Sequence, residues 1–259
     1  MFRFGKLYEN LSVIQAKPWL GKIKPFKILN NVYFVGTYQA SCHLIDTGKG
    51  LIMIDPGYSA TAYLVKDSIC QLGFKLQDIK YIINTHHHKD HIQATAEFVN
   101  LSGAKSLLGR YDVEKASTYF TPDIIVDDGD TLTLGNTTIR FLHTPGHTKG
   151  TISFFFDAVE NGKTYHVGSF GGAGLNTMKK ETFDFEGCRE AYFNSLERLK
   201  KEKVDVFLGN HTWNNDTFTK AQKLFETGEN AFIDDTIWLK FLETYEKRLK
   251  KLIAEETTL

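Results

Sequence analysis

The sequence predicts a mixed α+β protein in which two sheets pack face to face with helices outside. The expected elements run β-rich, then β/α, then β-rich, then β/α, so two similar halves meet near residues 127–130. No Pro/Ser-rich linker divides the 259 residues, and a chain of this length can bury a full core. We therefore expect one domain, residues 1–259, with halves of about 1–128 and 129–259.

Short apolar strands bounded by Gly, Asn and Asp dominate the first half, and the turn at residues 47–50 indicates a hairpin. Ser59 is the expected N-cap of a helix that ends before Gly73, with Tyr63, Val65 and Ile69 on its apolar side. We expect strands at 31–36, 41–46, 51–55, 80–84 and 105–108, and helices at 59–72, 92–101 and 111–117.

The second half is β-rich to residue 168 and helical towards its end, with Asn161-Gly162 as a hairpin turn. In the last helix, Trp238, Phe241, Tyr245 and Leu249 fall on one face at spacings of three and four. The segments TLTL, TTIRFLH, TISFFF and KTYHVG and residues 204–208 are the expected strands; residues 185–201, 218–226 and 233–251 are the expected helices.

Composition argues against two classes of partner. Lys plus Arg and Asp plus Glu both count 31, and this zero net charge disfavours a nucleic-acid binder. The longest apolar runs are far too short for a membrane span, and the first 25 residues show no secretory signal. Cys42, Cys70 and Cys188 form no CxxC, so we expect buried thiols in a reducing compartment. A cytoplasmic location follows, or a secreted one if a leader has been removed; the oligomeric state stays open.

The main chemical signal is the segment THHHKDH, which directly follows a buried apolar strand. His86 and His88 are two residues apart, so in an extended segment both point the same way while His87 points away. Asp90 and His91 follow where the chain turns into a helix, so they face a neighbouring position. Imidazole with some carboxylate suits zinc, although iron or manganese would also fit.

Two further histidines are candidate ligands. His147 stands in LHTPGHT and His211 in FLGNHT, each just beyond a predicted strand. Either one alone would be an ordinary loop histidine, but their shared placement at strand ends indicates a common metal site.

These three motifs in this order resemble the metallo-β-lactamase superfamily, from NVYFVG to about His211. The resemblance implies a four-layer αββα sandwich with metals at one edge between the sheets. It implies that His86, His88 and His147 bind a first zinc ion, and that Asp90, His91 and His211 bind a second. It also matches Asp55 to a residue that supports the metal loop, although a strand-end turn former is an equally good interpretation.

One position departs from many superfamily hydrolases. Thioesterases like glyoxalase II, many lactonases and processing nucleases carry a bridging Asp at the end of the strand that here reads KTYHVGS, where this chain has Ser169. Ser at this place resembles the β-lactamase subclass with three His on one zinc and Asp/His/His on the other, as does the opening NVYFVGTYQASCHLI.

The expected activity is hydrolysis by a metal-bound hydroxide that attacks a carbonyl carbon, with Asp90 as the catalytic residue that orients the nucleophile or relays its proton. β-Lactam or similar cyclic amide hydrolysis is the first hypothesis. The second is hydrolysis of a lactone, ester or thioester, and the third a zinc-binding protein without catalysis. The loops 37–40, 169–182 and 211–215 would shape the pocket for a small-molecule substrate. Tyr38, Phe170 and Trp213 are either pocket or core residues.

Overall fold

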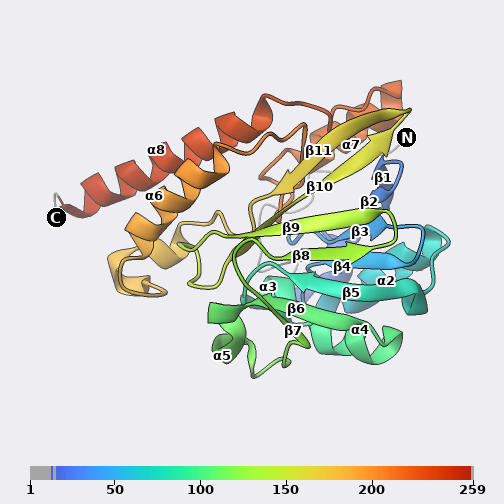
Figure 1. Cartoon of the computed structure of the whole chain (residues 1–259), viewed down its shortest axis with the longest axis horizontal. Coiled ribbons are helices and arrows are strands. Elements are labelled where there is room, and N and C mark those ends of the chain that lie inside the picture. The colour runs from blue at the N-terminus through green and yellow to red at the C-terminus, as the bar shows by residue number, and fades with distance from the viewer. Residues whose placement is uncertain (1–12, 14–15, 258–259) are drawn as a thin grey trace.

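The computed structural model describes residue 13 and residues 16–257, and the segment 1–12, where no secretory signal is expected, lies outside these described residues. Two sheets form the centre of the molecule (Figure 1). The strands of the first sheet, in spatial order, are β1 (Phe26–Leu29), β2 (Val32–Phe34), β3 (His43–Asp46), β4 (Leu51–Ile54), β5 (Ile79–Asn84), β6 (Lys105–Gly109) and β7 (Ile124–Val126). Those of the second are β12 (Val206–Phe207), β11 (Lys163–Ser169), β10 (Ile152–Glu160), β9 (Thr137–His143) and β8 (Thr131–Leu134).

Strand direction decides where the loops of the first sheet meet. The pairs from β1 to β4 are antiparallel, whereas β4, β5, β6 and β7 are parallel to one another. The carboxyl ends of β4, β5 and β6 therefore open onto one edge of the sheet, where side chains from three loops can converge. In the second sheet only the β11–β12 pair is parallel.

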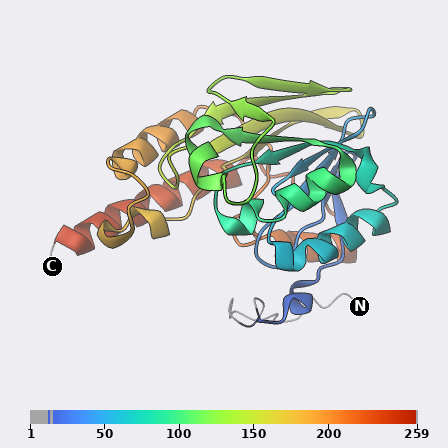
Figure 2. The ribbon, with the colours of Figure 1, turned by 90° about the horizontal axis from the view of Figure 1, so that it is seen from below.

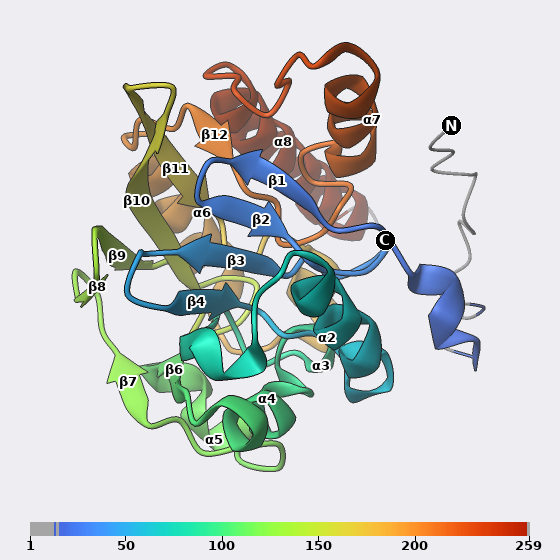
Figure 3. The same ribbon diagram turned by 90° about the vertical axis from the view of Figure 1, so that its right-hand side faces the viewer.

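Alternation along the strands separates the apolar layers. Ile52 and Ile54 of β4 belong to the core between the sheets, which also contains Phe154 of β10. Leu51 and Met53, the alternate residues of β4, pack against the helices that cover the outer face of the first sheet. These helices are α2 (Ala62–Gln71) and α4 (Thr95–Ser102), and in Figure 3 the strands β1–β4 lie between α2 and the strands β10 and β11.

The outer face of the second sheet is covered by α6 (Cys188–Leu199) and α8 (Ile237–Thr257), which lie side by side at one end of the molecule (Figure 1 and Figure 2). The predicted apolar face of α8 is buried here, and Trp238 packs edge-on against Phe155 and Phe207 of the sheet. Two helical layers thus enclose two sheets, which confirms the four-layer αββα fold. Other α-helices of the described residues are α3 (Lys89–Ile92), α5 (Val113–Ala116) and α7 (Thr217–Thr227).

Several local predictions were wrong. The strands β1 and β7 were not predicted, and the expected helix at 92–101 is two pieces, α3 and α4. Ser59 does not cap α2, because its hydroxyl donates a hydrogen bond to the carbonyl of Gln93. Tyr63 is exposed on α2, and so is Cys70, whereas the other two cysteines are buried as expected. Within the described residues, no helix is long and apolar enough to cross a membrane.

Candidate metal centre

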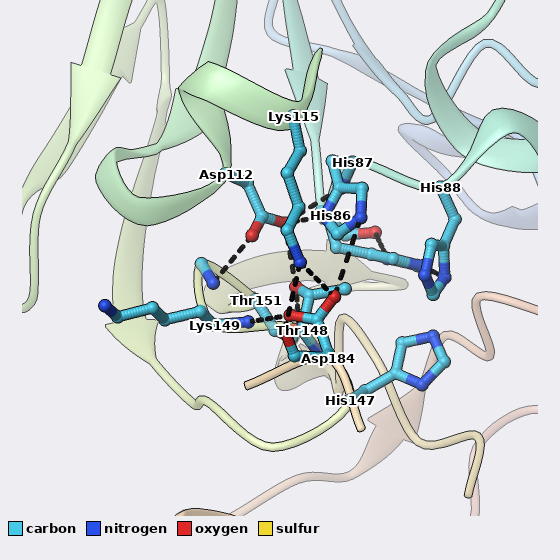
Figure 4. Close-up of polar contacts among 12 residues, drawn as sticks. His86, His87, His88, Asp112, Lys115, His147, Thr148, Lys149, Thr151 and Asp184 are labelled. Atoms are coloured by element: carbon cyan, nitrogen blue, oxygen red, sulfur yellow. Dashed lines mark hydrogen bonds and ion pairs between the residues drawn. The ribbon is translucent and has the colours of Figure 1, made fainter. Parts of the chain in front are cut away.

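The segment that follows β5 supplies four of the candidate ligands. Asn84 ends the strand fully buried, and its amide is held by the Leu107 carbonyl at 3.0 Å and by the Thr95 hydroxyl at 2.6 Å. The chain then bends at residues 85–87, is extended at His88 and enters α3 at Lys89, so the segment is not extended throughout as the sequence had suggested. The ring of His87 belongs to neither candidate group and lies against Asp112, its Nδ1 3.1 Å from the carboxylate, although its centroid is still 4.8 Å from that of His88 (Figure 4).

His86, His88 and His147 form a first group whose ligand atoms all lie within 4.8 Å of one another. Their ring centroids are 4.6–4.7 Å apart, and Nε2 of His86 is 3.1 Å from Nδ1 of His88. His147 follows β9, so this group joins a loop of the first sheet to a loop of the second.

Asp90, His91 and His211 form a second group of the same kind. Oδ2 of Asp90 lies 3.4 Å from Nε2 of His91 and 3.6 Å from Nε2 of His211. The two groups are adjacent, since the ring centroids of His86 and His91 are 4.2 Å apart. His211 follows β12, so the second group also combines both halves of the chain.

Hydrogen bonds fix the orientation of these rings. Asp55, buried at the end of β4 with φ +50°, accepts hydrogen bonds from the backbone N–H of Thr85 at 2.8 Å and from Nδ1 of His91 at 2.8 Å. The Nδ1 atoms of His147 and His211 donate to the carbonyls of Gly174 and Gln39 at 2.7 Å and 3.1 Å. Each Nε2 is then left to face its group, as in metal sites where a second partner fixes the histidine tautomer.

Most of the ring nitrogens are neutral at pH 7, which is the form that binds metal. Burial lowers the pKa of His147 to about 3 and the pKa of His88 and His211 to about 4, and it lowers the pKa of His86 well below its ordinary value. Burial also acts to lower the pKa of His91, but the charges of Asp90 and Asp55 outweigh it and raise this pKa to about 10.

The negative charges of Asp90 and Asp55 therefore make the second group a favourable place for a positive charge. Burial opposes ionisation of Asp90, yet His91 and His211 lower its pKa, so the carboxylate is charged. Nε2 of His91 is buried and has no hydrogen-bond partner among the described residues, although it lies beside this carboxylate. A divalent metal ion would supply both the missing partner and the positive charge, and the donor set of imidazoles with one carboxylate fits zinc.

A cleft of about 420 Å³ opens over both groups. Trp213 is 51% exposed and lies in the cleft wall, where its ring stacks on His211 at 4.3 Å. Tyr38 and Phe170 do not line the cleft: Tyr38 is half-buried against the core between the sheets and stacks on Phe218, and Phe170 is fully buried against Tyr192. The cleft is lined by Tyr58, His88, Lys89, Asp90, His147, Gly174, Asn176, His211, Trp213, Asn214 and Tyr245.

Sequence reasoning missed the charged residues beneath the first group. Asp112 and Asp184 lie on the far side of His87 from the cleft, and Lys115 pairs with Asp184 (Figure 4). A signal for Asp112 was present, because this Asp follows β6, the parallel neighbour of β5. Ser169 is buried at the end of β11 opposite Phe154 and does not line the cleft.

Comparison with known proteins decides the family. The model of the metallo-β-lactamase superfamily matches residues 35–211, which include all six candidate ligands. The chain belongs to this superfamily. It is an enzyme, a hydrolase of the superfamily, as its sequence relatives and structural neighbours are.

Known proteins of two kinds resemble the chain. Hydroxyacylglutathione hydrolase of Pelagibacter ubique is 31% identical over 185 residues, or 69% of each chain. That of Prochlorococcus marinus is 31% identical over 197 residues, or 73% of this chain and 70% of the relative. Among solved structures, FEZ-1 metallo-β-lactamase from Legionella gormanii has a TM-score of 0.87 at 28% identity, covering 92% of this chain and 98% of its own. BJP-1, a subclass B3 metallo-β-lactamase of Bradyrhizobium japonicum, has a TM-score of 0.86 at 28% identity, covering 94% and 98%.

Proposed function

We propose that the chain hydrolyses β-lactams or similar cyclic amides with two zinc ions held by the two ligand groups. The observation that carries this proposal is the composition of the groups. Asp90 is the only carboxylate in them among the described residues, and Asp55 is already engaged by His91 and Thr85. By the sequence resemblance, Ser169 stands at the position where superfamily thioesterases carry a bridging Asp. The two groups therefore offer five imidazoles and one carboxylate, the donor set that the β-lactamase resemblance implies.

Bound zinc supplies Lewis-acid activation of water and of the substrate carbonyl. The chain contributes geometry and charge. The six ligand side chains fix the two positions side by side, and the ionised Asp90, which lines the cleft, accepts a hydrogen bond from the attacking water and orients it. Lys89 lies at the same cleft and offers a positive charge to a substrate carboxylate, which most β-lactams carry.

The shape of the cleft suits a substrate with substituents on both sides of the scissile bond. A second cavity of about 350 Å³ adjoins the cleft through Trp213, Asn214 and Tyr245. A third, of about 230 Å³, adjoins it through Tyr58 and Lys89. These volumes accommodate a drug-sized molecule with two arms.

Thioester hydrolysis is the second candidate, and the sequence relatives favour it. Relatives named hydroxyacylglutathione hydrolase share 31% identity over about two thirds of the chain. The same two ligand groups serve a thioester carbonyl equally well, because the attack on the carbonyl carbon is the same step. Lactones and simple esters belong with this candidate.

A turnover panel on the zinc-loaded protein separates the candidates. It contains a penicillin, a cephalosporin, a carbapenem, a lactone and a glutathione thioester, with His88→Ala as the control that removes one ligand. We expect β-lactam turnover that the control loses. Turnover of the thioester or lactone alone would refute the β-lactam proposal in favour of the second candidate, and no turnover of any of them would refute both.

A further inference from the structure

A buried carboxylate lies directly beneath the first ligand group, outside the cleft. Asp112 is fully buried at the start of α5, and it accepts three hydrogen bonds (Figure 4). Oδ2 accepts from the backbone N–H of His87 at 2.9 Å and from the Thr148 hydroxyl at 2.7 Å, and Oδ1 accepts from the backbone N–H of Gly150 at 2.7 Å. Burying a carboxylate costs free energy unless hydrogen bonds of this kind satisfy it. The three donors therefore stabilise the buried carboxylate of Asp112.

The three donors belong to the two loops that supply the first group. His87 lies between the ligands His86 and His88, and Thr148 directly follows the ligand His147. One carboxylate thus connects a loop of the first sheet with a loop of the second. No ligand side chain makes this connection itself.

The backbone of the loop 147–151 also lies in close contact with the backbone at the start of α5 and at Gly109. A Cβ atom on Gly150 would lie 2.4 Å from the backbone nitrogen of Asp112, and one on Gly109 would lie 2.1 Å from the carbonyl oxygen of Gly150. These two glycines allow the loop 147–151 to press against the start of α5. The position of His147 relative to His86 and His88 therefore depends on the contact at Asp112.

We propose that Asp112 is a positioning residue that holds His86, His88 and His147 in the arrangement required to bind the first metal ion. This inference rests on the proposed ligand roles of these histidines. The second group is supported by Asp55 and the Gln39 carbonyl instead, so its affinity does not depend on Asp112.

The test is calorimetric titration of metal-free protein with zinc, comparing the wild type with Asp112→Asn and Asp112→Ala. We expect first-site affinity to fall about 10–100-fold, the usual effect of removing a residue that orients metal ligands, while second-site affinity stays the same. Asp112→Asn should lose less than Asp112→Ala, because its remaining carbonyl oxygen can still accept. Glu114→Gln is the matched control: it removes the charge of an exposed carboxylate two residues from Asp112 on α5, so both affinities should stay close to the wild-type values.

Thr148→Val keeps the inference testable if the Asp112 variants do not fold. It removes one donor with little change of shape, and first-site affinity alone should fall. Unchanged first-site affinity in every folded variant would overturn the inference, as would an equal fall at both sites. A wild-type protein that binds no zinc would instead refute the ligand roles, so the two failures are distinguishable.

Discussion

His87 and His88 are neighbours in the chain, but their side chains face different surroundings. His88 lies with His86 and His147 at the cleft, whereas both ring nitrogens of His87 face carboxylates, Asp112 at 3.1 Å and Asp184 at 3.9 Å. The chain bends at residues 85–87, so the two side chains leave the segment towards different partners. The chemistry of each histidine is therefore set by its surroundings, not by residue type.

Replacement of these two residues should have unequal effects. His88→Ala removes a ligand of the first group, so we expect about one zinc ion per chain instead of two and loss of activity. His87→Ala leaves all six candidate ligands in place, and metal content and activity should stay within a fewfold of the wild type. Elemental analysis with an activity assay measures both. Equal damage from the two substitutions would contradict the assigned orientation of the segment.

Ser169→Asp tests the position at which this chain departs from many superfamily hydrolases. A carboxylate there would add a negative oxygen ligand of the kind zinc accepts, so we expect tighter binding of the second ion. Cyclic amide hydrolysis should become slower, because the added charge offsets the positive charge that activates water. Zinc titration and steady-state kinetics measure the two effects. Unchanged second-site affinity would mean that the side chain at 169 does not reach the metals.

Among the helices and strands, α8 shows most clearly how a sequence pattern contributes to the free energy of unfolding. Trp238 of α8 is 1% exposed, and its indole N–H donates to the carbonyl of Leu199 at 3.0 Å. Trp238→Ala would leave a large cavity between α8 and the second sheet, while the Leu199 carbonyl would keep its hydrogen bond from the backbone N–H of Glu202 at 3.1 Å. We expect a loss of about 3–5 kcal/mol in the free energy of unfolding. Denaturant unfolding measures it, and Leu239→Ala, at a neighbouring position 45% exposed, should change little.

Helices and strands with a long, clear sequence pattern could be predicted from the sequence. Very short strands could not. The apolar face of α8 repeats at spacings of three and four over several turns, and β9–β11 are long runs rich in aliphatic and aromatic residues. β1 and β7 have only four and three residues, so their assignment depends on pairing with neighbours that no local pattern reveals. Tyr63 and Cys70 are apolar enough to suggest burial, yet the sheet covers only one side of α2.

The same distinction applies to the site. The six candidate ligands could be predicted because each follows a strand, and because four of them lie in one short segment. Asp112 also follows a strand, but its role was not predicted, because that role comes from three hydrogen bonds to segments 25 to 38 residues away. The sequence did not show which of the three aromatic residues lines the pocket. Only the packing of the folded chain shows that Trp213 lines the cleft, whereas Tyr38 and Phe170 pack against other aromatic rings.

For the whole molecule, metal binding should increase the free energy of unfolding. An ion that binds only the folded chain stabilises it by about 2.7 kcal/mol per site when the free ion is at 100 times its Kd. We therefore expect chelation to lower the thermal midpoint and abolish activity, and zinc to restore both. Scanning calorimetry with and without chelator measures the effect. An unchanged midpoint would contradict metal binding at the two groups.

Each ligand group takes two side chains from the segment 86–91 and one from beyond residue 131, so a bound ion crosslinks the two halves without a covalent bond. With an ion bound, the two halves can separate only after a metal–ligand bond breaks. We therefore expect bound metal to act mainly by lowering the rate of unfolding. The connector at 127–130 is exposed except at Asp127, which is half-buried. After a proteolytic cut there, the zinc-loaded fragments should remain associated through gel filtration for longer than the same fragments in chelator.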